Sequence, residues 1–307
     1  MDIDESLPSG LTTRALTMAD ARDVYRVMAE LERAEIGTSD IEEADIVADW
    51  QRPSVDVPQV TLGVFAGDRL VGYAEAAMDG RGDAAVHPGW HGRGIGTALA
   101  RWMQHRSGQL GASTVGMSVP QDGSGDRLLE SLGYRVRWTS WVLQLPEGAS
   151  IPPRELPEGH LLRAARPEEY PTVHGVVEDA FLEFADRERA PFADFDAGIV
   201  RRPGFEPWQI RVVDGPDGIV GAAVLVMARD EDGAPVEGYV DQLAVRADRR
   251  GLGLAQALLV DAFTLAREHG APATGLATDS RTGALSLYQK VGMVVTQTWV
   301  NRAVDLD

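Results

Sequence analysis

The chain has 307 residues, enough for two domains of ordinary size. Hydrophobic residues make up 44% and charged residues 25%, which excludes a disordered chain, and the absence of cysteine excludes disulfides and a cysteine nucleophile. The net charge of −18 divides into −9 for residues 1–153 and −9 for residues 154–307, so neither half is a basic, nucleic-acid-binding domain.

The sequence also bears on location and metal content. The longest apolar stretch, at residues 219–228, is too short to span a bilayer and predicts a buried strand. The first ten residues are acidic and polar, unlike a secretion signal, and the six histidines lack metal-ligand spacing. We therefore expect a cytoplasmic monomer or homodimer with no metal, no membrane association and no nucleic-acid partner.

The two halves repeat one order of elements. Residues 11–28 and 160–177 each predict a short strand, a cap-rich turn and an amphipathic helix. A hairpin follows in each half, at residues 61–78 and 210–227. After it we expect a strand, a glycine-rich turn, a helix, a further strand, a short helix and a closing strand. The predicted closing strands are residues 138–145 and 296–304.

Residues 145–159 separate the halves and are rich in proline and glycine, which predicts a semi-rigid spacer. The expected domains are therefore residues 1–146, a linker at 147–159, and residues 160–307.

A glycine signature occurs twice at one offset. Gly94 and Gly253 are equivalent and lie 159 residues apart, and Gly133 and Gly292, in a second landmark, are also 159 apart. The same ordered pair at one offset indicates duplication of a ligand-binding module. In each copy an apolar strand ends, a basic glycine-rich turn follows and a helix begins, which is the geometry that binds phosphate through free helix amides.

Three kinds of phosphate loop compete for this signature. A nucleoside-triphosphate loop requires Gly-Lys-Ser/Thr, and a dinucleotide loop follows the first strand and carries a third glycine; neither matches. The remaining fit is Arg/Gln-x-x-Gly-x-Gly/Ala, the pyrophosphate loop of coenzyme A, which residues 250–255 match at every defined position.

The chain resembles the GCN5-related N-acetyltransferases (GNAT family) at this loop and at the Ala-x-x-Leu-Tyr-x-x-x-Gly segment of residues 284–292. The arrangement of two modules is similar to that of the tandem acetyltransferases that include mycothiol synthase. The resemblance implies an α+β fold with a mixed sheet, in two tandem acyl-CoA N-acyltransferase modules. The first module departs from the motif at His91 and is expected to be degenerate.

The resemblance also implies acetyl-CoA as cosubstrate and a set of cofactor-binding residues. In the second module these are Leu243, Ala244, Val245, Arg250, Gly251, Leu252, Gly253, Leu254, Ala255 and Gln256. In the first they are Val86, His91, Gly92, Arg93, Gly94, Ile95, Gly96 and Thr97. Many relatives carry Asn where this chain has Arg281, so the chain departs from the family at the side chain that usually contacts the pantetheine arm.

The expected catalytic residues lie in the second module. By the resemblance Tyr288 is the general acid that protonates the leaving thiolate; Leu129 holds its position in the first module and cannot donate a proton. Glu237 and Asp241 lie on or just before the strand that enters the cleft, and either fits a general base or a solvated strand-edge charge. Carboxylates at 178, 179, 183 and 186 fit either an ammonium-binding site or an exposed acidic helix face.

We therefore expect an N-acetyltransferase that moves an acetyl group from acetyl-CoA directly to a primary amine of a small molecule, such as an amino-sugar, an amino acid or a polyamine. The alternative is a coenzyme A-binding sensor or scaffold without turnover, which would have no need of Tyr288.

Overall fold

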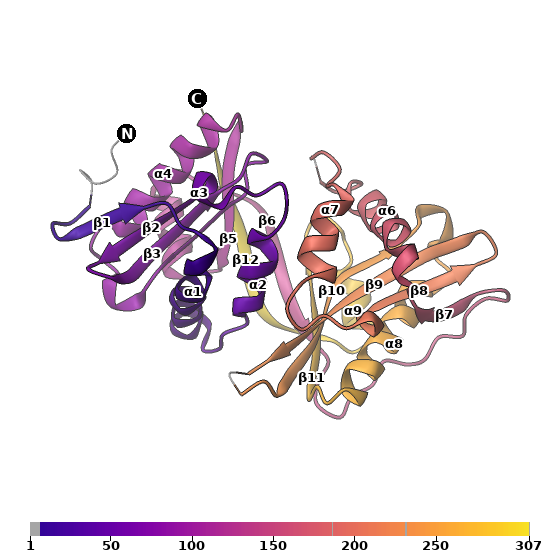
Figure 1. Cartoon of the computed structure of the whole chain (residues 1–307). Coiled ribbons are helices and arrows are strands. Elements are labelled where there is room, and N and C mark those ends of the chain that lie inside the picture. Colours follow the sequence, from indigo (N-terminus) through magenta and orange to yellow (C-terminus); the bar gives the residue numbers. More distant parts are fainter. Residues whose placement is uncertain (1–6, 186, 231, 307) are drawn as a thin grey trace. The chain divides into compact units, whose positions relative to one another are not determined.

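The computed structural model describes residues 7–185, 187–230 and 232–306 and divides into two compact units. Unit 1 contains residues 1–140 and 297–307, and unit 2 contains residues 141–296. Each unit has a sheet with helices on both faces (Figure 1); the four-stranded sheet of unit 1 is antiparallel, and the sheet of unit 2 is mixed.

Unit 1 begins with a four-stranded antiparallel sheet in the order β1-β2-β3-β4. Its elements are β1 (Leu11–Arg14), α1 (Ala21–Ile36), α2 (Glu43–Trp50), α3 (Val57–Val60), β2 (Thr61–Ala66), β3 (Arg69–Ala76), β4 (Gly82–Val86), α4 (Ile95–Gln109), β5 (Thr114–Pro120) and α5 (Ser124–Ser131). The predicted hairpin is confirmed as β2 and β3.

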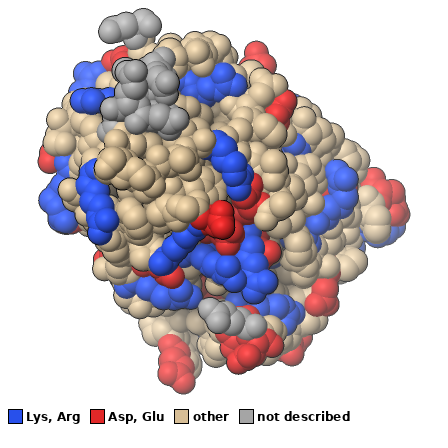
Figure 2. Space-filling view, turned by 60° about the vertical axis from the view of Figure 1, so that its left-hand side comes forward, with Lys and Arg blue, Asp and Glu red and all other residues tan. Residues whose placement is uncertain are grey.

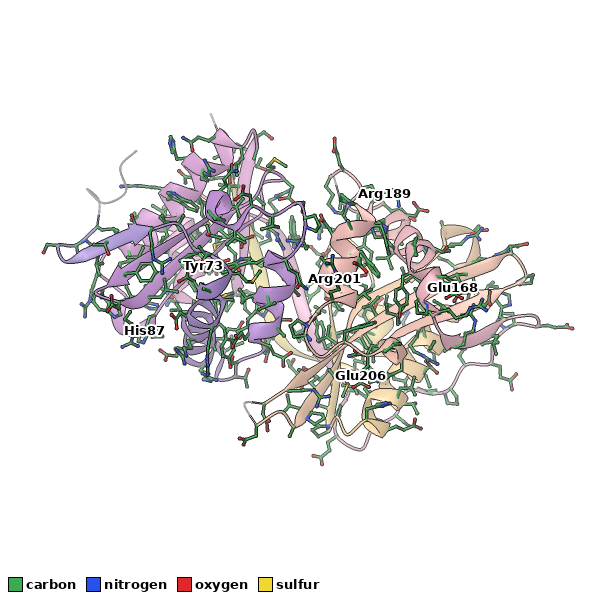
Figure 3. All side chains as sticks on the ribbon, in the orientation of Figure 1. Tyr73, His87, Glu168, Arg189, Arg201 and Glu206 are labelled. Carbon is green, nitrogen blue, oxygen red and sulfur yellow. The ribbon has the colours of Figure 1, made fainter. Side chains whose placement is uncertain are left out.

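Alternation along the strands, shifted by one residue at a bulge around Val71 of β3, gives unit 1 one apolar cluster on each face of the sheet. Tyr73 and its cross-strand partner Ala85 face α1, whereas Val71 and Ala74 pack against the buried residues of α4. Tyr73, labelled in Figure 3, is 2% exposed. The sheet is therefore held between α1 and α4.

Unit 2 repeats this plan with the strand order β11-β10-β9-β8-β7. Its elements are β7 (Leu161–Ala164), α6 (Tyr170–Phe181), α7 (Phe192–Phe195), β8 (Ile210–Gly215), β9 (Gly218–Arg229), β10 (Pro235–Val245), α8 (Leu254–Glu268), β11 (Ala273–Asp279) and α9 (Leu285–Lys290). Val173 on α6 belongs to one core cluster, and Leu258 and Phe263 on α8 belong to the other.

The closing strands differ from the sequence prediction. β6 (Arg135–Gln144) passes from unit 1 into unit 2, and β12 (Val294–Asp305) passes from unit 2 into unit 1. Residues 299–305 of β12 pair antiparallel with β5 of unit 1, and the Leu145 backbone N–H after β6 donates to the Thr274 carbonyl of unit 2 at 3.0 Å. The two closing strands have similar sequences, and strands with the same alternation can pair with the sheet edge of either unit. The sequence therefore did not reveal which unit each closing strand joins.

The predicted spacer also packs instead of standing free. Ile151 is 5% exposed and belongs to the core cluster of unit 2, with Leu156 packed against that cluster. The segment after β6 is therefore part of unit 2.

A buried ion pair fastens β12 to unit 1. The Arg302 guanidinium contacts the Asp126 carboxylate on α5 and donates to the Tyr134 carbonyl at 3.1 Å. Side-chain exposure is 10% for Arg302 and 9% for Asp126.

We predict that Arg302→Ala destabilises unit 1 although the residue lies at the C-terminal end of the chain. Leaving Asp126 buried without its partner costs about 3–5 kcal/mol. The measurement is hydrogen exchange of the β5 amides, which should speed up, with Arg135→Ala as the control, because its pair with Asp305 is exposed on both sides. Faster exchange in β11 with β5 unchanged would contradict the exchange of strands.

Candidate functional site

Both glycine loops close their turn in the same way. The loop after β4 is fixed by His91, whose Nε2 lies 2.8 Å from the Val86 carbonyl oxygen. At the equivalent position after β10, Arg250 Nε donates to the Val245 carbonyl at 3.3 Å. His91 therefore makes the same contact to the strand-end carbonyl as the motif arginine.

The glycine before each loop helix has a conformation that other residues rarely adopt. Gly94 has φ 84° and caps α4, and Gly253 has φ 80° and caps α8. The amides that open each helix have no intrahelical partner and carry partial positive charge. This arrangement favours binding of an anion. Both loops thus have the backbone geometry of a pyrophosphate site.

Beside the loop of unit 1 lies a cavity of about 300 Å³. Its wall comes from α1, β4, the loop, α4, β5, α5 and Trp299 of β12. Of the residues predicted to bind cofactor, the wall contains Val86, His91, Gly92, Gly94, Ile95, Gly96 and Thr97. Arg93 instead lies over the Trp90 ring, 4.5 Å from its centroid.

Two neighbouring parallel strands separate at each site. In unit 1 a bridge joins Arg81, just before β4, to Gly116 of β5. In unit 2 the β10–β11 register ends at Val240 and Leu276, and a bulge follows in β10. This divergence is the one expected for admission of a pantetheine arm.

A carboxylate missed by the sequence analysis lines the cavity of unit 1. Asp83 lies on β4 in register with Glu75 of β3, so both side chains are on one face of the sheet. Burial, reinforced by the negative charge of Glu75 and opposed by Arg81, raises the pKa of Asp83 to about 7. A carboxyl group of this pKa exchanges a proton at neutral pH.

The charge that acts on Asp83 is held in place by hydrogen bonds. Glu75 Oε2 accepts from Trp50 Nε1 at 3.0 Å and from the Tyr73 hydroxyl at 2.9 Å. Arg81 lies 3.8 Å from Glu75 and binds Asp49 at 2.9 Å. The only sequence signal for Asp83 was the 159-residue offset, which aligns it with Gln242 in unit 2.

Two further carboxylates reach the same cavity from α1. Glu35 accepts the Ser124 backbone N–H at 2.8 Å, and Glu32 accepts the backbone N–H of Asp40 at 2.7 Å. Burial raises the pKa of Glu32. With Asp83 they give this cavity an acidic side.

The residues expected to be catalytic in unit 2 lie on α9 and β10. Tyr288 is 9% exposed, and burial raises the pKa of its phenol to about 12, so the hydroxyl stays protonated at neutral pH. Glu237 accepts a hydrogen bond from Gln144 Nε2 at 2.9 Å, and Asp241 lies at the β10 bulge. In unit 1 the equivalent of Tyr288, Leu129, is 3% exposed and packs in the core.

The loop residues predicted to bind cofactor in unit 2 already have contacts within the chain. Arg250 forms a two-bonded ion pair with Glu183, at 2.7 Å for each bond, and Gln256 Nε2 donates to the Pro152 carbonyl at 2.8 Å. On β10, the backbone pairs with β9 at Leu243, Ala244 and Val245. In the loop, Gly251 has φ 79° and Leu252 is exposed. At the start of α8, Leu254 is buried and Ala255 packs beside the core.

The acidic segment after α6 does not present a free ammonium site. Glu178 is bidentate to Arg187, and Asp179 contacts Arg189, labelled in Figure 3. Glu183 is held by Arg250 as described above, and residue 186 lies outside the described residues. The interpretation of these carboxylates as an ammonium-binding site is therefore not supported.

No described helix is long and apolar enough to cross a membrane, and the described residues contain no group of side chains suited to a metal ion. Acidic and basic side chains are intermixed on the face drawn in Figure 2.

Comparison with known proteins identifies the family. The acetyltransferase (GNAT) family matches residues 23–134 and 170–293. Mycothiol acetyltransferase of Salinispora arenicola is 31% identical over 249 residues, covering 78% of each chain, and that of Pseudarthrobacter chlorophenolicus is 27% identical over 298 residues, covering 90% of this chain and 88% of the relative.

Solved structures agree with the sequence relatives. A GCN5-related N-acetyltransferase from Sphaerobacter thermophilus superposes with a TM-score of 0.72 at 26% identity, over 97% of this chain and 96% of that one. A tandem GNAT protein from the clavulanic acid biosynthesis pathway has a TM-score of 0.71 at 17% identity, over 96% and 98%, and supports the fold alone. The chain therefore belongs to the GNAT family, as an acetyl-CoA-dependent N-acetyltransferase with two GNAT folds in tandem.

Proposed function

We propose that the chain transfers the acetyl group of acetyl-CoA to the primary amine of a small cationic molecule, and that the transfer takes place in the cavity of unit 1. The observation that carries this proposal is Asp83, a carboxyl group of pKa about 7 in the wall of that cavity, close in sequence to the glycine loop.

Different residues of the cavity would carry out different steps of acetyl transfer. The amides that open α4 bind the pyrophosphate, and the gap between β4 and β5 takes the pantetheine arm. Asp83 removes a proton from the ammonium group, directly or through one water, so that the free amine attacks the thioester carbonyl. On collapse of the tetrahedral intermediate the nitrogen releases its second proton to solvent, and the departing thiolate takes a proton from solvent, because Leu129 offers none.

The residues in the wall of the cavity indicate the chemical class of the acceptor. Glu32, Glu35 and Asp83 favour a cation, while Met28 and Trp90 contribute apolar surface. An amino-sugar, an amino acid or a polyamine fits this description. The relatives named as mycothiol acetyltransferases support the amino-sugar class among these.

Unit 2 is the second candidate for the transfer. Its loop carries the complete motif, and its Tyr288 keeps the proton that a general acid needs. Glu237 and Asp241 would then be its bases. This arrangement is weaker because Gln242 holds the position of Asp83 and an amide cannot accept the proton.

We predict that Asp83→Asn lowers kcat by a factor of about 10²–10⁴ with little change in acetyl-CoA affinity, because only the base is removed. The base is active when ionised, so kcat/KM of the parent should rise with pH up to about 7 and then level off; Asp83→Asn should lose that limb. Thiol release from acetyl-CoA across a panel of amines is the assay. The matched control is Gln242→Asn, and a preserved pH limb in Asp83→Asn would remove Asp83 from the mechanism.

We predict that Tyr288→Phe changes kcat by less than about twofold, since the ring still packs and only a proton donor outside unit 1 is lost. The same thiol-release assay measures it. A loss of about 10²-fold or more would move the transfer to unit 2 and establish Tyr288 as general acid.

A further inference from the structure

The segment that follows β6 runs to the coenzyme A loop of unit 2. Its residues 149–156, here called the strap, include Ile151, which is buried in the same core cluster as Leu254 and Tyr288. Leu254 opens the loop helix α8, and Tyr288 is the residue expected beside the thioester. The strap thus joins the cluster that contains both ends of the expected ligand site.

At the loop itself the strap makes direct contact. A Cβ added to Gly253 would lie 2.6 Å from Nε and 2.7 Å from Cγ of Arg154, so the arginine side chain covers this glycine. Gln256, a predicted pyrophosphate contact, donates instead to the carbonyl of Pro152 in the strap. Two of the predicted ligand positions are therefore engaged by the strap.

The equivalent glycine of unit 1 is open. A Cβ at Gly94 would meet no atom within 4 Å, although its φ and its place before the helix match those of Gly253. The difference between the units is the strap and not the backbone of the loop.

Apolar packing and one hydrogen bond, and not the charge of Arg154, hold the strap in place. A guanidinium beside the N-terminus of α8 faces the positive end of the helix. Electrostatics therefore oppose the contact, and the burial of Ile151, the packing of Leu156 and the bond from Gln256 hold the segment there.

We propose that the strap occupies the coenzyme A site of unit 2, so that the chain binds a single coenzyme A, in unit 1. Arg154 takes the position of the pyrophosphate, and Ile151 anchors the strap in the core cluster that also contains Tyr288. This inference concerns unit 2 and does not depend on Asp83 as the base in unit 1.

Hydrogen exchange of the unmodified protein with and without free coenzyme A is the first test. We expect protection of the amides of residues 95–97 and no change at residues 254–256. Protection at residues 254–256 would overturn the proposal. Because this experiment follows binding and not turnover, its result is independent of the activity of Asp83→Asn.

Calorimetric titration with coenzyme A is the second test. We expect one site in the parent, loss of it in Gly94→Glu, and a second site when the strap is released by Ile151→Ser, Arg154→Gly and Leu156→Ser together. Glu155→Gln, an exposed change within the strap, is the control and should keep one site. Loss of binding in Arg154→Ala would show that this arginine contacts the ligand, and would overturn the proposal.

Discussion

The fold of unit 1 depends on a strand from the far end of the chain. Arg302 on β12 is buried against Asp126, and the free energy of taking both charges out of water is recovered only while the pair is intact. Because Trp299 of the same strand lines the cavity, the proposed site is complete only after the last residues are in place. The repeat is therefore visible in the sequence as two contiguous modules, whereas the folded unit 1 draws on both ends of the chain.

The two modules have kept different parts of one site. Unit 1 has an open loop and the carboxylate of Asp83 on β4, with Leu129 in place of the tyrosine. Unit 2 keeps Tyr288 and the arginine of the motif, with Gln242 in place of the carboxylate and the strap on its loop. His91 shows that motif matching can mislead, since its ring makes the same contact to the strand-end carbonyl as Arg250 does.

Local sequence patterns predicted most of the helices and strands but few of the contacts between them. Hairpins, loop helices and the positive φ of Gly94 and Gly253 follow from short-range chemistry, so sequence was sufficient for them. The exchange of β6 and β12 was not predictable, because pairing partners of similar strands are chosen by the whole fold. Asp83 was missed for a related reason: its pKa is raised by burial and by the charge of Glu75 across the sheet, and no spacing along the chain reveals either.

Loss of a general base and loss of a general acid do not slow acetyl transfer to the same extent. An alkyl ammonium group of pKa about 10 is protonated at neutral pH and cannot attack until a base removes its proton. A thiol has a pKa of about 8.5, so its thiolate departs without full protonation and solvent can supply the proton afterwards. A module that lacks the phenol but keeps the carboxylate retains the more demanding half of the chemistry. By this reasoning the leucine at position 129 is a tolerable change, whereas the glutamine at position 242 leaves unit 2 without the base proposed for unit 1.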